Sequence, residues 1–544
     1  MKILQFILVI GITTLFASCA SQSPLTGGER DASPPKLVLS VPQNGAVNSY
    51  PKQLDFEFDE FVQVKSLNQK LIVSPPLKYQ PELKQKAKGF SLILKDTLKP
   101  NTTYNFYFGD AIQDLNENNP LSDFNFVFST GSEIDSLSVK GAISDALTLK
   151  PEKDFLVALY KDTTDSTPLK NKPDYITRSN ASGIFQFNYV KAGRYKMVGF
   201  IDKNNNYLLN PENEKIAFLK NPITISQESK NDSLLLFSFS EDRTKQYIKK
   251  SSRKLPYKAE IIFNTSSDFK PTLYNDSLKI LDYYSTVKND TLTVFFKDSL
   301  QYFNENIKLI IGYYKTDSLR NSKMTKDTIV LNWSERDKYK PSVSVNYQWS
   351  IKNQSRINAK QPLSILFNEP IDLKPHAIVL FDSAKKNIPI ELYKDSSNCL
   401  KWHIKAKLAD GKNYRLFLDT TYIKSSYGHS LKNDTLSFET MLPEDFANLK
   451  INIKLPNHTT FIIELQDEKS NLVKKWQVSS DANLHVERLM PGKYNLKATE
   501  DSNNNGKWDN GFYILHLQPE KTFYYNQTFQ LRANWDLEVN WSVK

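Results

Sequence analysis

Oxygen-bearing side chains alternate along a short segment near the C-terminus, a spacing that could bind calcium. The segment reads Asp-Ser-Asn-Asn-Asn-Gly-Lys-Trp-Asp over residues 501–509. Calcium is a hard cation, and a calcium loop supplies oxygen ligands from alternate positions, with a glycine at the sixth position for the sharp turn. The alternate positions are occupied here by Asp501, Asn503, Asn505, Lys507 and Asp509.

The loop departs from a complete EF-hand at its twelfth position, where Phe512 replaces the bidentate glutamate. Any remaining ligands would have to come from elsewhere in the fold, and a plain Asn/Gly turn is the alternative interpretation. A second loop has the same spacing, with Tyr207 where glycine is wanted. We expect that tyrosine to resist the sharp turn, so this second loop is the weaker calcium candidate; its oxygen-bearing residues are Asp202, Asn204, Asn206 and Asn210.

Besides these two loops, Cys19 is chemically distinctive; it follows an apolar run and two small residues. The run covers residues 3–16 behind the single cation of Lys2, too short to span a bilayer and typical of a secretory signal. The segment Phe-Ala-Ser-Cys at residues 16–19 resembles the lipobox of bacterial lipoproteins. That resemblance implies removal of residues 1–18, lipidation of Cys19 and anchoring to the outer membrane. An ordinary signal peptide with an incidental cysteine is the alternative.

Signatures of catalysis are absent from the sequence. The histidines lack the spacing of a zinc site, and there is no nucleophile elbow, phosphate-binding glycine loop or Cys-His signature. Acidic residues at two strand ends, Asp59-Glu60 and Asn368-Glu369, are interpreted as structural turns. Cys399 is the one cysteine after Cys19, so the mature chain has no intrachain disulfide, and we expect a buried structural thiol. The sequence therefore predicts a protein that is not an enzyme.

The elements that position these residues are predicted to be strands. The chain has 544 residues, 40% hydrophobic, which is globular composition and enough for several domains. Short runs of alternating apolar residues recur throughout, separated by Asn, Asp, Pro and Ser, while long helical periodicity is absent. This pattern predicts an all-β fold, a tandem array of about five β-sandwich domains.

Two pairs of segments repeat along the chain. The strand end at Phe58 recurs at Phe367, and a closing Phe-x-Thr at Phe128 recurs at Phe438, so these repeats lie 309 or 310 residues apart. A Gly-x-Tyr segment followed by an Asp/Asn-rich loop begins at Gly193 and again 299 residues later. Constant spacing over long stretches indicates two copies of each fold.

The first pair resembles the bacterial Ig-like domain of surface-layer and other exported proteins. In the second copy, Asp410 and Lys412 replace Pro100 and Thr102 of its Leu-x-Pro-x-Thr-x-Tyr segment. The Gly-x-Tyr pair resembles the prealbumin-like sandwich of carboxypeptidase regulatory domains. The whole layout is similar to Bacteroidota lipoproteins with Ig-like domains. The predicted order is a signal peptide (1–18), lipidated Cys19 with a tether (19–33), an Ig-like domain (34–131), a prealbumin-like domain (136–241), an unassigned β-sandwich (242–336), a second Ig-like domain (338–443) and a second prealbumin-like domain (446–544).

Charge and layout limit the function. The net charge of +11 is spread along the chain and favours anionic partners such as lipid head groups or acidic glycans, and an exported protein is not expected to bind nucleic acid. The sequence predicts a lipid-anchored, non-catalytic envelope protein, an accessory that binds an outer-membrane β-barrel or another lipoprotein. A glycan- or matrix-binding adhesin is the alternative. The sequence leaves open which face of the outer membrane the protein occupies, and calcium is the one cofactor it suggests.

Overall fold

The structure is a computed structural model that describes residues 31–228, 233–266, 272–274, 282–297, 306–317, 322–333, 344–456 and 459–544. Cys19, the predicted signal peptide and most of the predicted tether lie outside the described residues. Strands dominate the described part of the chain, and its α-helices α2 (Leu67–Lys70) and α3 (Thr167–Lys170) are four residues each. None of the described helices is long and apolar enough to cross a membrane. The predicted all-β fold of tandem β-sandwich domains is confirmed.

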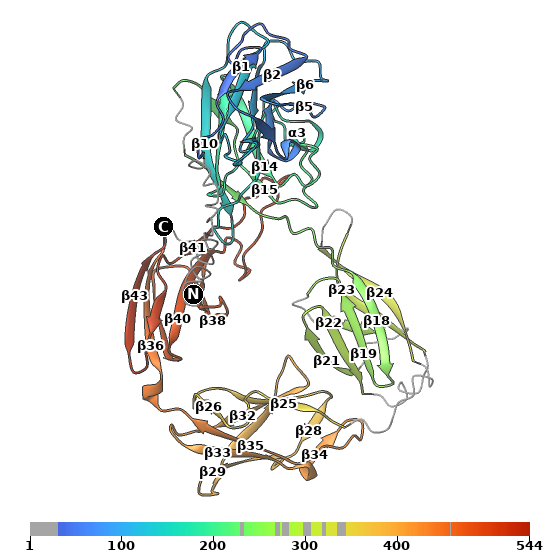
Figure 1. Cartoon of the computed structure of the whole chain (residues 1–544). Coiled ribbons are helices and arrows are strands. Elements are labelled where there is room, and N and C mark those ends of the chain that lie inside the picture. The colour runs from blue at the N-terminus through green and yellow to red at the C-terminus, as the bar shows by residue number, and fades with distance from the viewer. Residues whose placement is uncertain are drawn as a thin grey trace, which may run out of the picture. The chain divides into compact units, whose positions relative to one another are not determined.

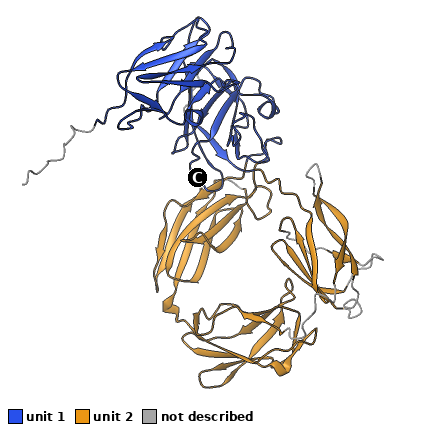
Figure 2. Cartoon of the chain, turned by 45° about the vertical axis from the view of Figure 1, so that its right-hand side comes forward, with its two compact units in different colours: residues 1–240, 512–518 blue, residues 241–511, 519–544 orange. Residues whose placement is uncertain are grey.

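The chain forms two compact units, which Figure 2 shows in different colours. Unit 1 contains residues 1–240 and 512–518, and unit 2 contains residues 241–511 and 519–544. Five hydrophobic clusters form the cores of the described residues, two in unit 1 and three in unit 2. Each cluster falls within one of the five predicted domain ranges, and we retain those ranges as proposed boundaries.

The first core of unit 1 is rich in phenylalanine because alternate residues of its strands face inward. The ring of Phe56 stacks on Phe90 with centroids 4.8 Å apart and meets Phe126 edge to face at 5.0 Å. A four-stranded sheet in the order β1-β2-β6-β5 packs with a three-stranded sheet and a two-stranded ribbon. The strands are β1 (Leu37–Val41), β2 (Gln53–Phe58), β6 (Gly89–Ile93) and β5 (Glu82–Lys86); β4 (Ile72–Ser74), β7 (Thr103–Tyr107) and β9 (Asn125–Ser129); and β3 (Val62–Val64) with β8 (Ile112–Asp114).

The second core of unit 1 lies between a three-stranded sheet, β13-β10-β17, and a larger sheet, β12-β11-β14-β15, to which β16 adds through β14. β10 pairs with β17 in parallel, whereas its other neighbour is antiparallel. The strands are β13 (Ile184–Val190), β10 (Leu137–Asp145), β17 (Leu234–Ser238), β12 (Tyr175–Arg178), β11 (Leu156–Tyr160), β14 (Gly193–Phe200), β15 (Ile216–Phe218) and β16 (Ile223–Ile225).

Unit 2 begins with a sandwich that has no counterpart among the repeats. Its sheets have the orders β18-β19-β22-β21 and β20-β23-β24, and the long β23–β24 hairpin covers one face of the core (Figure 1). The strands are β18 (Ile248–Leu255), β19 (Lys258–Phe263), β22 (Thr291–Phe296), β21 (Tyr283–Lys288), β20 (Thr272–Tyr274), β23 (Asn306–Thr316) and β24 (Ser322–Asn332).

The next sandwich of unit 2 repeats the strand order of the first sandwich of unit 1. A four-stranded sheet, β25-β27-β32-β31, faces the sheet β26-β35-β33-β29-β30, and a ribbon of β28 and β34 completes the fold. The strands are β25 (Tyr347–Trp349), β27 (Leu363–Phe367), β32 (Lys401–Ala406), β31 (Ile390–Lys394), β26 (Ser355–Ile357), β35 (Asp434–Thr440), β33 (Asn413–Leu418), β29 (Ile378–Asp382), β30 (Asn387–Ile388), β28 (Ile371–Leu373) and β34 (Ile423–Ser425), with 3₁₀ turns η4 (Thr420–Tyr422) and η5 (Pro443–Asp445).

The last sandwich of unit 2 repeats the second sandwich of unit 1, including the parallel pairing of its first and last strands, β36 and β43. The tyrosine of each Gly-x-Tyr segment makes the same contact: Tyr195 Oη donates to the carbonyl of Lys191 at 2.8 Å, and Tyr494 Oη donates to that of Met490 at 2.7 Å. The strands are β39 (Ala482–Leu489), β36 (Ala447–Lys454), β43 (Asp536–Ser542), β38 (Leu472–Val478), β37 (Phe461–Asp467), β40 (Gly492–Glu500), β41 (Thr522–Tyr524) and β42 (Phe529–Leu531).

Candidate interaction and metal sites

The C-terminal Asp/Asn loop begins where β40 ends, and a buried carboxylate shapes its turn. Asp501 is 1% exposed. Its Oδ1 accepts the backbone N–H of Asn505 at 3.0 Å, and its Oδ2 accepts that of Gly506 at 3.0 Å. The side chain of Gln477 donates to Oδ2 as well, at 2.9 Å. Gly506 has φ +75°, a conformation that a residue without Cβ adopts at little cost.

The structure brings the other predicted ligands together at this loop. The amide nitrogens of Asn503 and Asn505 both donate to Asp509 Oδ2, the latter at 2.7 Å, and Lys507 N–H donates to Asn505 Oδ1 at 2.9 Å. Protein N–H groups thus satisfy the carboxylates that calcium would bind. In the described part of the chain, no group of three or more His, Cys, Asp or Glu side chains is placed to hold a metal ion. Calcium binding by this loop stays a prediction.

Glu520 closes the loop from outside the sequence motif. Its Oε1 accepts the N–H of Ser502 at 2.7 Å and its Oε2 accepts that of Asp509 at 3.0 Å. Burial raises the pKa of Glu520, and the nearby charges of Asp509 and Asp501 raise it further. Glu520 lies past the last loop position, so spacing within the motif could not have identified it.

The second loop has the same backbone architecture. Asp202 accepts the N–H of Asn206 at 3.1 Å and that of Tyr207 at 3.0 Å, while Asn204 Oδ1 also accepts from Asn206 at 3.1 Å. Tyr207 has φ +61°, close to that of Gly506. The expectation that a tyrosine would resist this turn is therefore wrong: the turn forms, and the half-buried ring lies under the ammonium of Lys172 at 5.4 Å.

A glutamate also closes this second loop. Glu214 accepts the N–H of Lys203 at 3.3 Å and that of Asn210 at 2.9 Å, and burial raises its pKa. Because a buried Asp and a Glu at equivalent positions stabilise both loops, each loop has a fixed turn soon after β14 or β40. Calcium binding at Asp202 likewise stays a prediction.

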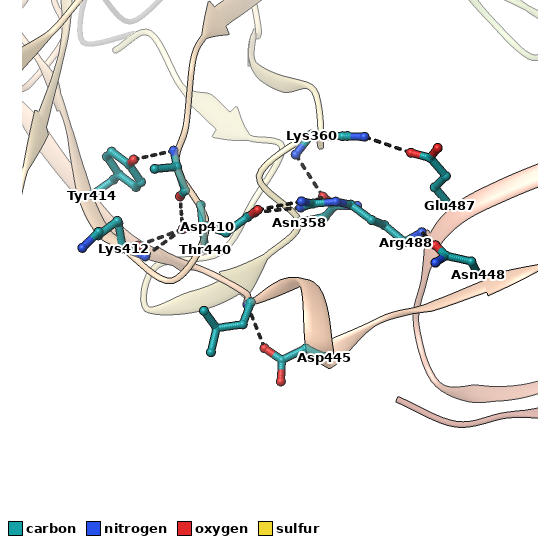
Figure 3. A network of polar contacts seen from close by, with 12 residues as sticks. Asn358, Lys360, Asp410, Lys412, Tyr414, Thr440, Asp445, Asn448, Glu487 and Arg488 are labelled. Carbon is teal, nitrogen blue, oxygen red and sulfur yellow. Dashed lines mark hydrogen bonds and ion pairs between the residues drawn. The ribbon is translucent and has the colours of Figure 1, made fainter. Parts of the chain in front are cut away.

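A charged joint connects the last two sandwiches of unit 2 (Figure 3). Arg488, near the end of β39, donates from both terminal nitrogens to the two carboxylate oxygens of Asp410, at 2.7 and 2.6 Å. The side chains are 18% and 27% exposed, and Arg488 reaches Asn358 at 3.3 Å as well. A bidentate pair of this kind fixes orientation as well as distance. The rim pair of Lys360 with Glu487, 3.0 Å apart, is largely exposed.

The turn that carries Asp410 is held in the same way as its counterpart in the first sandwich of unit 1. Thr440 Oγ1 donates to the carbonyl of Ala409 at 2.6 Å, and Lys412 N–H donates to Thr440 Oγ1 at 3.0 Å. In the first copy, Thr130 makes the equivalent contacts with Lys99 and Thr102, at 2.7 and 3.0 Å.

The joint explains where the copies differ in sequence. Asp410 stands where the first sandwich of unit 1 has Pro100, and Arg488 stands where the second sandwich of unit 1 has Tyr189. The backbone conformation is shared, with φ +59° at Tyr189 and φ +57° at Arg488. The two sequence differences therefore create one salt bridge. Aligning the two copies of each repeat could have revealed this pair of differences.

The first strand presents an apolar edge. In the sheet order, β1 lies at the end of its sheet with β2 as its neighbour. Val38, Leu39 and Val41 are 66%, 54% and 54% exposed. Leu39 and Val41 also line a hollow of about 300 Å³ on the outer face of the sheet, bordered by Lys86 and Lys88. Unblocked apolar edges are pairing sites for another strand.

The strand-end acid Glu369, which the sequence assigned to a structural turn, lies in a buried polar cluster. Glu369 is 2% exposed; Ser425 Oγ donates to its Oε1, and its Oε2 is 2.7 Å from His429 Nδ1. The carboxylate lies between serine and histidine, so the histidine is not placed as a base for the hydroxyl. This cluster ties β28 to β34. Cys399 is half-buried, contrary to the buried thiol that we expected.

Residues 31–130 match the model of the bacterial Ig-like domain family. No curated protein matches this chain. Among solved structures, the chain is similar to surface layer protein SbsC, domains 1–6, with 9% identity over 92% of this chain and 68% of that chain and a TM-score of 0.16. It is similar to BcpA, the major pilin subunit of Bacillus cereus, with 7% identity over 75% and 99% and a TM-score of 0.13.

A further similarity, to an L,D-transpeptidase from Mycobacterium smegmatis, has 14% identity over 27% of this chain and 74% of that chain, with a TM-score of 0.14. TM-scores this low carry no argument about function. The family match covers the first sandwich of unit 1, whose strand order recurs in unit 2. The N-terminal sandwich therefore matches a bacterial Ig-like domain.

Proposed function

We propose that this protein is a lipid-anchored, non-catalytic component of the cell envelope that acts as an interaction module. In this proposal, lipid on Cys19 holds the chain at the outer membrane, and the partner is an outer-membrane β-barrel or another lipoprotein. The observation that carries the proposal is the apolar edge of β1 (Leu37–Val41).

The edge of β1 has the composition of a strand that accepts a partner. Natural edge strands are usually blunted by charge, proline, a β-bulge or a covering segment; Leu-Val-Leu-Ser-Val contains neither charge nor proline, and its pairing register with β2 shifts between Leu37 and Leu39. A partner strand would gain main-chain hydrogen bonds from the edge and bury its exposed apolar side chains. A strand supplied by a membrane-bound protein is the occupant that this proposal commits to.

The position of β1 in the chain supports a partner near the membrane. Leu37 follows Cys19 by 18 residues. Such a segment, fully extended, spans at most about 60 Å. An edge that close to its own anchor meets membrane-bound partners at a high effective concentration.

The joint at Arg488 and Asp410 supports a structural role as well. It fixes two sandwiches of unit 2 relative to each other through paired, mostly buried charges. A fixed joint lowers the conformational entropy that these two sandwiches lose when they bind a partner.

The test is an affinity purification of the tagged, lipidated chain from its own membranes in mild detergent, with mass spectrometry of the captured proteins. We expect a stoichiometric membrane partner that Leu39→Lys releases, because a lysine at an edge opposes strand addition. Val330→Lys on β24 is the matched control, since Val330 is also an exposed apolar strand residue, and it should retain the partner. Recovery of the chain alone, or equal loss in both variants, would contradict the proposal.

The lipid anchor has its own readout. Cys19→Ala should leave the unprocessed chain without incorporated radiolabelled palmitate and move the protein out of the outer-membrane fraction. Palmitate incorporation that persists in Cys19→Ala would refute the anchor. Protease treatment of intact cells then assigns the membrane face, because only a surface-exposed chain is cleaved.

A further inference from the structure

A cleft of about 420 Å³ lies between two sandwiches of unit 2. One wall comes from the sandwich of β21 and β22, and the other from β28, β31, β32 and β34. The rings of Tyr257 and Tyr427 stack across this joint with centroids 4.1 Å apart, and Tyr427 Oη donates to the carbonyl of Phe296 at 3.2 Å. These contacts hold the two walls together, so the cleft is part of a packed joint.

Two ammonium groups converge on one ring inside the cleft. Lys297 Nζ lies 4.5 Å from the centroid of Tyr284, and Lys394 Nζ lies 4.6 Å from the same centroid. The lysines come from different sandwiches, so the joint itself brings the like charges together. The aromatic face attracts each cation, but the two cations repel each other.

The charge of Lys394 is incompletely balanced by the protein. Burial lowers the pKa of Lys394; Cys399 and Asp372 oppose this shift, and the charge of Lys297 lowers the pKa further. Lys297 pairs with the exposed Asp282 at 2.7 Å, and Asp372 lies directly opposite Lys424 in the β28–β34 register. Among the described residues, no ion pair within 4.0 Å includes Lys394.

The site disfavours the charged form of Lys394, so an anion that binds beside this ammonium group would stabilise it. Tyr284 and Trp402 line the same cleft and present aromatic surface next to the cations. Aromatic faces pack against the apolar faces of sugar rings, while cations bind their carboxylate or sulfate groups. The net charge of +11 also favours acidic ligands over neutral ones.

We propose that this cleft binds the anionic group of an acidic sugar, with Lys394 and Lys297 as the charged contacts and Tyr284 and Trp402 as the aromatic walls. The inference does not rest on the proposed function, because the surface that it uses is remote in sequence from β1. An acidic glycan is favoured over a lipid head group because the aromatic walls would face a ring instead of acyl chains.

The test is isothermal titration calorimetry of the full chain with tetragalacturonic acid, a linear acidic oligosaccharide, and with maltotetraose as the neutral oligosaccharide. We expect binding of the acidic ligand alone. Lys394→Gln should weaken the binding of tetragalacturonic acid about tenfold, because one charge-assisted hydrogen bond is lost. The matched control is Lys432→Gln, an exposed lysine of the same sandwich outside the cleft, which should leave the affinity unchanged.

A thermal melt separates binding from folding. Lys394→Gln removes a disfavoured charge, so its melting temperature should equal or exceed that of the wild type, while the oligosaccharide binds about tenfold more weakly. Tyr284→Leu should weaken the oligosaccharide more than it weakens inorganic sulfate, because only the sugar contacts the ring.

Three results would overturn the proposal: no heat with tetragalacturonic acid at millimolar concentration, equal weakening in Lys432→Gln, or binding of anionic phosphatidylglycerol vesicles that depends on Lys394 while the oligosaccharide does not bind. The affinity purification that tests β1 does not use this cleft, so failure of one proposal leaves the other unaffected.

Discussion

At the scale of residues, the chain uses buried acids mainly to fix backbone turns and joints. Asp501 and Asp202 each accept two loop N–H groups, and Glu520 and Glu214 close the same loops. Removing such an acceptor leaves buried donors unsatisfied, which costs more than the hydrogen bond contributes. The Asp/Asn pattern therefore has a structural explanation that holds whether or not calcium binds.

The salt bridge between Asp410 and Arg488 predicts a pH dependence of stability. The hydrogen bonds from Arg488 hold the pKa of Asp410 below its ordinary value. The stabilisation is therefore present above the ordinary carboxyl pKa and is lost as pH falls through the lowered one. The free energy of unfolding of Asp410→Asn should be about 1 kcal/mol lower than that of the wild type near pH 7, and this difference should shrink below about pH 4. Urea unfolding at a series of pH values measures it.

Glu487→Gln is the control for that experiment, because Glu487 belongs to the exposed rim pair of the same joint. Its effect should be small at every pH, since exposed ion pairs contribute little. An Asp410→Asn difference that stays constant down to pH 2.5, or that Glu487→Gln reproduces, would show that the joint does not depend on the Asp410 charge.

At the scale of elements, close approach of strands constrains single positions. Gly89 opens β6 opposite Glu57, and a Cβ built there would overlap the backbone carbonyl of Phe56. Backbone cannot give way as a flexible side chain can, so this position requires glycine. The same reasoning does not apply to Gly492, where the nearest atom to a built Cβ is the Tyr494 ring at 3.7 Å, an ordinary contact.

Gly89→Ala should therefore destabilise the first sandwich by about 2 kcal/mol or more, as overpacking of a closed site does. Gly492→Ala, in a strand of the last sandwich, should change stability by less than about 1 kcal/mol. Differential scanning calorimetry of the full chain compares the two. Equal melting curves for the two variants would mean that β2 and β6 do not approach as closely as the structure has them.

At the scale of the whole molecule, the division into units does not follow the order of the chain. Residues 512–518 belong to unit 1 although the chain on both sides belongs to unit 2 (Figure 2). Tyr513 is fully buried and meets Phe218 edge to face at 5.3 Å, while Gln518 Nε2 donates to the carbonyl of Phe218 at 3.0 Å. His516 Nε2 lies 2.6 Å from Asp165, which also pairs with Lys196.

Tyr513→Ala should therefore destabilise unit 1, by about 3 kcal/mol for a large buried aromatic side chain. Hydrogen–deuterium exchange with mass spectrometry should show faster exchange in β14 and β15 than in β36, which lies in unit 2 within the sandwich nearest to Tyr513 in sequence. Leu515→Ala is the control, because Leu515 is exposed in the same segment and should alter neither region. Faster exchange in β36 alone would contradict the assignment of this segment to unit 1.

The sequence by itself determined the strand content, the tandem sandwiches and the internal repeats, because period-two alternation and turn residues are local properties that each strand carries in its own residues. The sequence also predicted that Asp501 and Asp509 lie in one loop, because residues only eight positions apart in a turn are close together in any fold. The lipid anchor at Cys19 was predicted from the sequence alone and lies outside the described residues.

The tertiary structure decided what depends on distance across the chain. Glu520 closes its loop from beyond the motif, Arg488 finds Asp410 across a domain joint, and Lys394 and Lys297 meet over one tyrosine ring. None of these contacts follows from spacing, because each joins residues on different strands whose approach is set by how sheets and sandwiches pack. The sequence likewise did not show that Tyr207 takes a glycine-like φ of +61°, with its ring beneath the ammonium of Lys172.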